Sequence, residues 1–263
     1  MTLPTAAYWR EWGAGHPRDA LFLHCGNAHS GAWKGVAAHL EHALHIVAPD
    51  HPGHGRSPAW DPALDLHDQS RDFARDAFPD AAQVDLIGHS FGATVALRLA
   101  LESPERVRSL TLIEPVLFCL LKGSELFDRL QAMSVPVKTL IDAGQDEAAA
   151  QLFTERWGNG TAWTDIPEAQ SAYITRCIPL IPASWPALYE DEGGLFTPEN
   201  LVRVQCPVQL IRGDQSAEEI PLIHGKLAQA LGAQDHIVAG AGHMVPITHA
   251  GEVAELIRVF MGL

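Results

Sequence analysis

Short apolar runs alternate with segments of helical spacing along the first 115 residues of the chain. The apolar runs predict strands at residues 8–12, 20–24, 45–49, 83–87 and 107–113, the first of them at a sheet edge. The segments between them have apolar residues at helical spacing and predict helices at residues 33–42, 68–78 and 93–100. Strands that alternate with helices imply a mostly parallel sheet covered on both faces.

The alternation of strand and helix patterns stops between residues 116 and 200. No strand is predicted there, and prolines such as Pro136 separate short helical segments. Helices are predicted there at residues 125–133, 147–157 and 168–177. The alternation then resumes, with strands at 208–212 and 236–238 and helices at 222–231 and 252–260. We therefore predict an α/β fold with a mostly parallel, doubly wound sheet. Residues 1–115 and 201–263 form its core, and residues 116–200 form an inserted all-helical cap over the carboxyl ends of the strands, where such sheets bind ligands.

Composition narrows the classes of protein and partner. The 263 residues are 47% hydrophobic and carry a net charge of −14, which argues against nucleic acids and membranes as partners. Residues 1–10 show no export signal, no apolar run is long enough to span a bilayer, and the four cysteines form no C-x-x-C pair. We therefore expect a cytoplasmic protein with free thiols. The 14 histidines include no H-E-x-x-H motif, and neither a metal nor a cofactor is expected.

The most specific motif is G-H-S-F-G at residues 88–92, which lies between a predicted strand and a predicted helix. A serine at such a turn sits in a strained backbone with its hydroxyl exposed, and the flanking glycines remove Cβ atoms that would collide there. Ser90 is therefore the candidate nucleophile of a serine hydrolase. Its general base is expected to be His243, in a glycine-containing loop after the last strand, because a neutral imidazole can take and return the serine proton. His89, inside the motif, is interpreted as a residue that shapes the turn.

Four segments together resemble the α/β-hydrolase fold superfamily over essentially the whole chain. They are H-C-G-N at residues 24–27, D-H-P-G-H-G-R-S at 50–57, the motif around Ser90, and G-H-M at 242–244. The resemblance implies that the backbone N–H groups of Phe91 and Gly26 hold the oxyanion of the reaction. Cys25 stands where related enzymes usually have glycine, so the path of that loop is less certain. The turn at 50–57 is interpreted as architecture beside the site, with its histidines hydrogen-bonded locally.

The acid behind the histidine is the open question. Relatives usually carry it in a Gly-x-x-Asp turn after the penultimate core strand, but here that turn places Ser216 at the aspartate position, with Asp214 two residues earlier. Some superfamily members carry the acid after the preceding strand, where this chain has Glu114. A carboxylate that ends a buried strand is costly unless it is used or paired. We favour Glu114 as the acid and keep Asp214 as the alternative.

These residues predict a carboxylesterase-like serine hydrolase that acts on a small apolar or aromatic acyl substrate through an acyl-enzyme. Asn27, His29, Trp157, Trp163 and Trp185 are candidate pocket residues. C–C bond hydrolysis, lactone opening and acyl transfer use the same triad and remain alternatives, as does a non-catalytic binding protein of this fold. The substrate is the expected partner, and a homodimer is compatible with the sequence.

Overall fold

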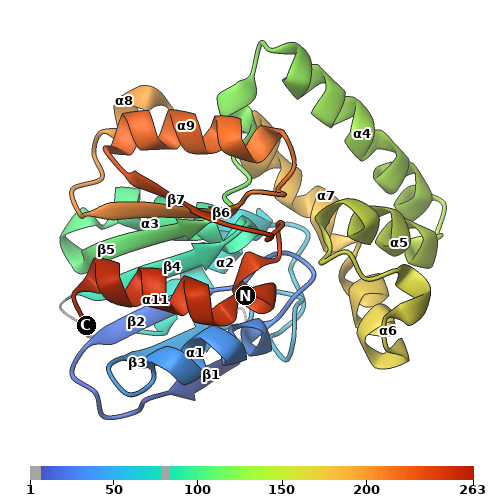
Figure 1. The fold of residues 1–263 in the computed structure, drawn as a ribbon. Coiled ribbons are helices and arrows are strands. Elements are labelled where there is room, and N and C mark those ends of the chain that lie inside the picture. Colours follow the sequence, from blue (N-terminus) through green and yellow to red (C-terminus); the bar gives the residue numbers. More distant parts are fainter. Residues whose placement is uncertain (1–6, 79–82) are drawn as a thin grey trace.

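A seven-stranded sheet forms the centre of the structure (Figure 1). The computed structural model describes residues 7–78 and 83–263, so most of segment 1–10, where no export signal was expected, lies outside the described residues. The strand order is β1-β3-β2-β4-β5-β6-β7, with β1 antiparallel to β3 and the other neighbours parallel. The strands are β1 (Trp9–Trp12), β2 (Asp19–Leu23), β3 (His45–Pro49), β4 (Val84–His89), β5 (Val107–Ile113), β6 (Val208–Gly213) and β7 (Gln234–Val238). The predicted α/β class with a mostly parallel sheet is confirmed.

Alternate residues of the central strands β2 to β6 face two separate apolar cores, as the period of two in a strand requires. In β2, Ala20 and Phe22 face the core beneath α1 (Lys34–Leu40) and α11 (Ala250–Met261). Leu21 and Leu23 face the opposite core, which is covered by α2 (Leu66–Asp76), α3 (Phe91–Glu102) and α9 (Glu219–Leu231). Strands buried on both faces account for the continuous apolar runs in the sequence.

A helical segment connects β5 to β6, and its helices α4 to α6 lie to one side of the sheet (Figure 1). Its α-helices are α4 (Glu125–Asp142), α5 (Asp146–Trp157), α6 (Glu168–Cys177), α7 (Leu180–Trp185) and α8 (Pro198–Leu201). The expected end of the first helix near residue 133 is wrong, because α4 continues through Pro136. The sequence pattern also missed α7, which contains Pro182. The assignment of residues 116–200 as a separate cap domain remains a prediction.

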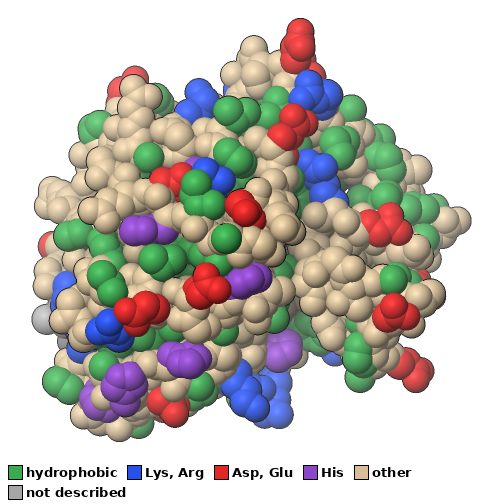
Figure 2. Space-filling model, in the orientation of Figure 1, with side chains coloured by type: hydrophobic (Ala, Val, Ile, Leu, Met, Phe, Trp, Pro, Cys, Tyr) green, Lys and Arg blue, Asp and Glu red, His purple; other side chains and the backbone are tan. Residues whose placement is uncertain are grey.

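Acidic side chains are spread over the face in Figure 2 and do not gather into one patch. In the described ranges, no group of three or more His, Cys, Asp or Glu side chains could hold a metal ion. No helix in the same part of the chain is long and apolar enough to cross a membrane.

Candidate active site

Ser90 lies at the turn between β4 and α3 in an unusual backbone conformation, with φ 55° and ψ −117°. Its N–H donates to the carbonyl of Ile113 at 2.8 Å, which holds the turn against β5. A Cβ atom on Gly88 would lie 2.3 Å from the carbonyl oxygen of Gly92, and one on Gly92 would lie 2.2 Å from that of Leu23. Both glycines are therefore required for the strand, turn and helix to approach this closely.

His243 links Ser90 to Glu114 through its two ring nitrogens. Its Nε2 lies 3.0 Å from Ser90 Oγ, and its Nδ1 lies 3.0 Å from Glu114 Oε2. All three side chains are buried. The carboxylate of Glu114 accepts a hydrogen bond from the Nδ1–H of His243, which leaves the Nε2 lone pair to accept from the serine hydroxyl. The arrangement suits general base catalysis by the imidazole.

Glu114 follows β5 and adopts a positive φ of 51°, which is uncommon for a residue with a Cβ. Its N–H donates to the carbonyl of Ile211 at 2.9 Å. Its Oε1 accepts from the N–H of Gly213 at 2.8 Å and from the hydroxyl of Ser216. Burial raises the pKa of this carboxyl, but the hydrogen bond and charge of His243, together with these two donors, lower the pKa below its ordinary value. Glu114 is therefore held as a carboxylate whose two oxygens are both hydrogen-bonded.

Asp214, the alternative acid, lies in a different place. Its Oδ1 accepts from the N–H of Gly240 at 2.8 Å in an exposed turn. Within the described residues, Glu114 is the carboxylate that hydrogen-bonds His243. Ser216, at the position usual for the aspartate, contacts the same carboxylate through its hydroxyl. The sequence pattern gave no sign of this contact, because it joins residues that are distant along the chain.

The histidine loop reaches Ser90 because β6 ends in a glycine. A Cβ on Gly213 would lie 2.0 Å from the carbonyl oxygen of Ala241, whose loop also accepts from the N–H of Gln215 at 2.9 Å. Gly240 supplies a turn with φ 75°. A Cβ on Gly242, by contrast, would have its nearest neighbour at 3.9 Å. The close approach of the loop to β6 therefore depends on the missing side chain of Gly213 and not on that of Gly242.

His89 holds the loop that carries His243 through a hydrogen bond to its backbone. Its Nε2 donates to the carbonyl of His243 at 2.8 Å, and the two rings lie 5.3 Å apart. Burial, and then the proximity of His243, lower the pKa of His89 to about 3. His89 is therefore a neutral hydrogen-bond donor, and its low pKa makes it a much weaker base than an ordinary histidine.

The predicted oxyanion donors, Gly26 and Phe91, line the same cavity as Ser90. Within the described residues, neither backbone N–H has a protein acceptor. The loop after β2, which contains Gly26, is fixed by His24. The Nδ1 of His24 donates to the carbonyl of Cys25 at 2.7 Å, and its Nε2 accepts from the N–H of His51 at 3.0 Å. The Cys25 thiol is buried, and burial raises its pKa to about 12, so it is a poor nucleophile beside Ser90.

The turn at residues 50–57 braces this loop. His51 Nε2 donates to the carbonyl of His24 at 3.0 Å. His54 Nδ1 donates to the carbonyl of Pro52 at 3.0 Å, and its Nε2 accepts from the N–H of Asn27 at 3.3 Å. The expected local hydrogen bond of His54 is therefore present, while the bond of His51 reaches the neighbouring loop.

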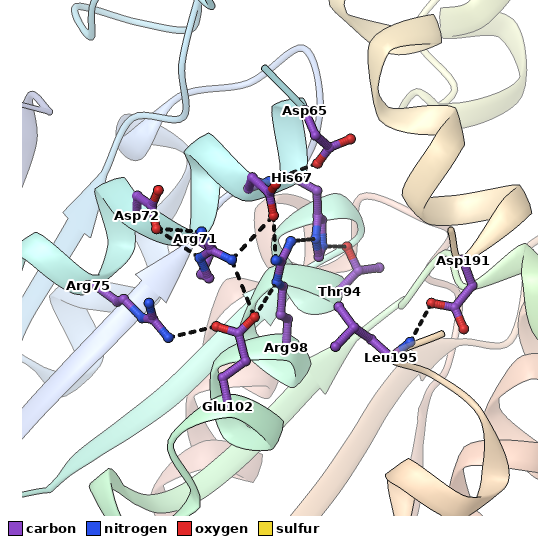
Figure 3. Close-up of polar contacts among 11 residues, drawn as sticks. Asp65, His67, Arg71, Asp72, Arg75, Thr94, Arg98, Glu102, Asp191 and Leu195 are labelled. Carbon is purple, nitrogen blue, oxygen red and sulfur yellow. Dashed lines mark hydrogen bonds and ion pairs between the residues drawn. The ribbon is translucent and has the colours of Figure 1, made fainter. Parts of the chain in front are cut away.

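A chain of hydrogen bonds fixes the first turn of α3 against α2 (Figure 3). Arg98 pairs with Asp68 and donates to His67 Nδ1 at 3.1 Å. His67 Nε2 donates to the hydroxyl of Thr94, which in turn donates to the carbonyl of Phe91 at 2.7 Å. Burial, and then the charge of Arg98, lower the pKa of His67 to about 3, so the ring stays neutral in this chain. The peptide groups around the predicted oxyanion donor are thereby held in place.

A cavity of about 540 Å³ opens in front of Ser90 and His243. Much of its lining is apolar and comes from the helical segment between β5 and β6, including Phe118, Leu130, Val137, Leu152, Trp157, Trp185 and Leu188. The rings of Trp157 and His243 form a T-shaped pair, with their centroids 4.7 Å apart. The arrangement can hold an apolar group next to the serine hydroxyl.

The other candidate pocket residues are distributed differently. Asn27 and His29 line a second cavity of about 280 Å³, to which Trp157 also contributes. Trp163 lines neither cavity and packs against a small apolar cluster within the helical segment. The expectation for Trp163 rested on composition alone, which does not tell pocket aromatics from packing aromatics.

One buried ion pair near the first cavity was not expected from the sequence. Glu219, at the start of α9, is fully buried and accepts from Arg156 of α5 at 2.6 Å. Arg156 also stacks over Trp157 at 5.2 Å. The ion pair joins the helical segment to the core. In the sequence, its only sign is a glutamate that stands directly before the apolar face of a predicted helix.

A parallel sheet with a serine at a strand–helix turn, a histidine after the last strand and a buried carboxylate at a neighbouring strand end defines the α/β-hydrolase class. The chain belongs to the alpha/beta hydrolase family, whose sequence profile matches residues 20–256.

Relatives of the chain include several hydrolases. It is 29% identical to the lipase LipV of Mycobacterium tuberculosis over 96% of this chain and 97% of that protein. It is 27% identical to the 2-hydroxymuconate semialdehyde hydrolase of a Pseudomonas species over 87% of this chain and 80% of that protein. The crystal structure of the enol-lactonase from Burkholderia xenovorans matches with a TM-score of 0.71 and 18% identity, covering 97% of this chain and 96% of that one. The last likeness concerns the fold alone.

Proposed function

We propose that the protein is a serine hydrolase that cleaves carboxylic esters of apolar acyl groups. The observation that carries the proposal is the continuous hydrogen-bonded line from Ser90 through His243 to Glu114, which faces a mostly apolar cavity. The similarity to a lipase over almost the full length of both chains supports the same conclusion.

The reaction follows from the position of each group. His243 Nε2 takes the proton of Ser90 as Oγ attacks the ester carbonyl carbon, and Glu114 stabilises the resulting imidazolium. The N–H groups of Gly26 and Phe91 stabilise the oxyanion. The carbon–oxygen bond to the leaving group then breaks, and His243 returns the proton to the departing alcohol. A water molecule, deprotonated by His243, releases the acid and restores Ser90.

The proposal is tested with a fluorophosphonate probe and a panel of p-nitrophenyl esters of graded acyl length. We expect the probe to label Ser90, and we expect Ser90→Ala to abolish both labelling and turnover. A lactone and a dienoic ring-cleavage product in the same panel test the alternatives. Absence of labelling together with absence of ester turnover would refute the proposed function. Turnover of the ring-cleavage product alone would assign the same residues to C–C bond hydrolysis.

A further inference from the structure

Tyr173 of α6 joins the helical segment to two loops of the core. Its hydroxyl donates to the carbonyl of Ala28 at 2.7 Å and accepts from the N–H of Gly55 at 2.9 Å. Ala28 follows Gly26 by two residues in the loop after β2, and Gly55 lies in the turn at residues 50–57 that braces this loop. A single side chain from outside the core therefore ties the two loops together, through both the proton and a lone pair of its oxygen.

The backbone N–H groups that follow Gly26 make long hydrogen bonds. The N–H of Ala28 donates to the carbonyl of Cys25 at 3.3 Å, and the N–H of Asn27 donates to an imidazole of the neighbouring turn at 3.3 Å. Asn27 also has a positive φ of 56°, which is uncommon for a residue with a Cβ. The bond from Tyr173 to Ala28 is short by comparison, so this half of the loop depends on Tyr173 more than on its own turn.

The ring of Tyr173 is itself fixed by its neighbours. It forms a T-shaped pair with His29, with the centroids 5.4 Å apart, and the guanidinium of Arg176 lies over it at 4.9 Å. Burial raises the pKa of the hydroxyl above its ordinary value, so the group keeps the proton that it donates to Ala28. The hydroxyl therefore has a defined position and a defined role as a donor to the loop.

The helical segment also packs directly on the backbone of Gly26. A Cβ on Gly26 would lie 3.0 Å from Cδ1 of Ile181 in α7. The N–H of Gly26 is a predicted oxyanion donor, and such a donor stabilises the transition state only when it is held at hydrogen-bonding distance from the oxyanion. Because the helical segment packs on Gly26 and bonds the loop two residues later, its contacts help to set the position of this N–H.

We propose that Tyr173 is a positioning residue of the oxyanion hole, whose hydroxyl holds the loop that presents the Gly26 N–H. The helical segment then completes the catalytic machinery in addition to covering the cavity. The inference rests on the proposed ester hydrolysis and adds to it a role for α6. The oxyanion forms on the carbonyl oxygen as Ser90 attacks, so a displaced Gly26 N–H would slow the reaction more than it weakens substrate binding.

Tyr173→Phe tests the proposal, because it removes the hydroxyl and keeps the ring against His29 and Arg176. We expect kcat/KM for p-nitrophenyl hexanoate to fall by about tenfold to 10²-fold, less than for the loss of a whole oxyanion donor, because the N–H is displaced and not removed. Acylation and deacylation both pass through an oxyanion, so the fall should lie mostly in kcat.

Tyr8→Phe is the matched control. The hydroxyl of Tyr8 contacts the exposed side chain of Arg56 at 3.4 Å, so the substitution removes a tyrosine hydroxyl without removing a bond to the backbone of either loop. We expect it to change kcat/KM by less than about twofold.

A pair of ketones separates a positioning role from a general structural one. Hexyl trifluoromethyl ketone adds to Ser90: its carbonyl carbon bonds to Oγ, the hydroxyl proton passes to His243, and the carbonyl oxygen becomes an oxyanion in the hole. Hexyl methyl ketone has the same chain and binds without this addition. Tyr173→Phe should raise the inhibition constant of the trifluoromethyl ketone by the factor by which kcat/KM falls, and leave that of the methyl ketone within about twofold.

The outcomes separate this inference from the proposed function. If the wild type neither hydrolyses the ester nor is labelled at Ser90 by the fluorophosphonate probe, both are overturned. If the wild type hydrolyses the ester and Tyr173→Phe keeps kcat/KM within about twofold, the positioning role alone is overturned. Equal weakening of both ketones in Tyr173→Phe would also overturn it, because the hydroxyl would then support the cavity in general. The comparison of the ketones does not depend on how much protein is folded, since both inhibition constants refer to active enzyme.

Discussion

Replacing Glu114 by glutamine should disable the base without changing the shape of the site. The Oε1 atom of Glu114 accepts from two donors, the N–H of Gly213 and the hydroxyl of Ser216. A glutamine will turn its carbonyl oxygen toward these donors and its NH₂ group toward His243. Nδ1 must then accept, the ring proton moves to Nε2, and Nε2 can no longer take the proton of Ser90.

The expected loss follows from the distance between the charges. The carboxylate oxygen lies 3.0 Å from Nδ1 of His243. At an effective dielectric constant of about 20, a pair of unit charges at this distance is worth about 5 kcal/mol. This corresponds to between about 10³-fold and 10⁴-fold in rate. We expect kcat/KM for a p-nitrophenyl ester to fall within this range while the thermal midpoint of unfolding stays close to the wild-type value.

Asp214→Asn is the matched control, because it removes a carboxylate that hydrogen-bonds the Gly240 N–H on the same side of the molecule. We expect it to change kcat/KM by less than about tenfold, since it makes no contact in the line from Ser90 to His243. If Asp214→Asn abolishes turnover and Glu114→Gln retains it, the assignment of the acid and the tautomer argument are both wrong.

Three further changes test other parts of the site. Adding Ser216→Asp to Glu114→Gln should recover at least about tenfold in kcat/KM, because the new carboxylate starts beside the lost one; no recovery would count against this placement. The pKa values of His67 and His89 are held near 3, below the unfolded value of about 6.5. The contribution of these histidines to the free energy of unfolding should therefore be complete above about pH 6.5. Below that pH, the free energy of unfolding should fall by about 1.4 kcal/mol per histidine for each pH unit. Urea titrations that give a constant free energy of unfolding from about pH 7.5 to about pH 5 would contradict this. The Cys25 thiol, with a pKa of about 12, should resist iodoacetamide at pH 8 in the folded protein and react after unfolding, and rapid alkylation of the native protein would argue against its burial.

The fold could be predicted from the sequence because its signals are local. Strands buried on both faces appear as short apolar runs, and the helices between them have amphipathic spacing. The errors lie in the helical segment, where prolines were taken as helix ends. Pro136 lies within α4, an 18-residue helix, because the contacts of the rest of the helix outweigh the hydrogen bond that proline cannot make.

The sequence predicts those residues of the candidate site that lie within continuous motifs, but not the contacts between motifs. Ser90 and His243 lie in glycine-marked turns whose local geometry the sequence encodes. The role of Gly213 and the contact from Ser216 to Glu114 depend on how separate strand ends meet, and no local pattern encodes them. Trp163 illustrates the same limit, since its place in a packing cluster follows from the arrangement of whole helices.

The position of the carboxylate follows from the parallel register of β5 and β6. Ile113 pairs with Ile211, and the N–H of Glu114 continues that ladder to the carbonyl of Ile211. The ends of the two strands therefore reach the same point beneath His243, and a carboxylate at this point can come from either strand. An aspartate at position 216 would place a second negative charge against Glu114, which like charges in a buried site disfavour. Ser216 instead donates a hydrogen bond to Glu114, so the serine in the usual aspartate position and the glutamate after β5 are best understood as one paired feature of this chain.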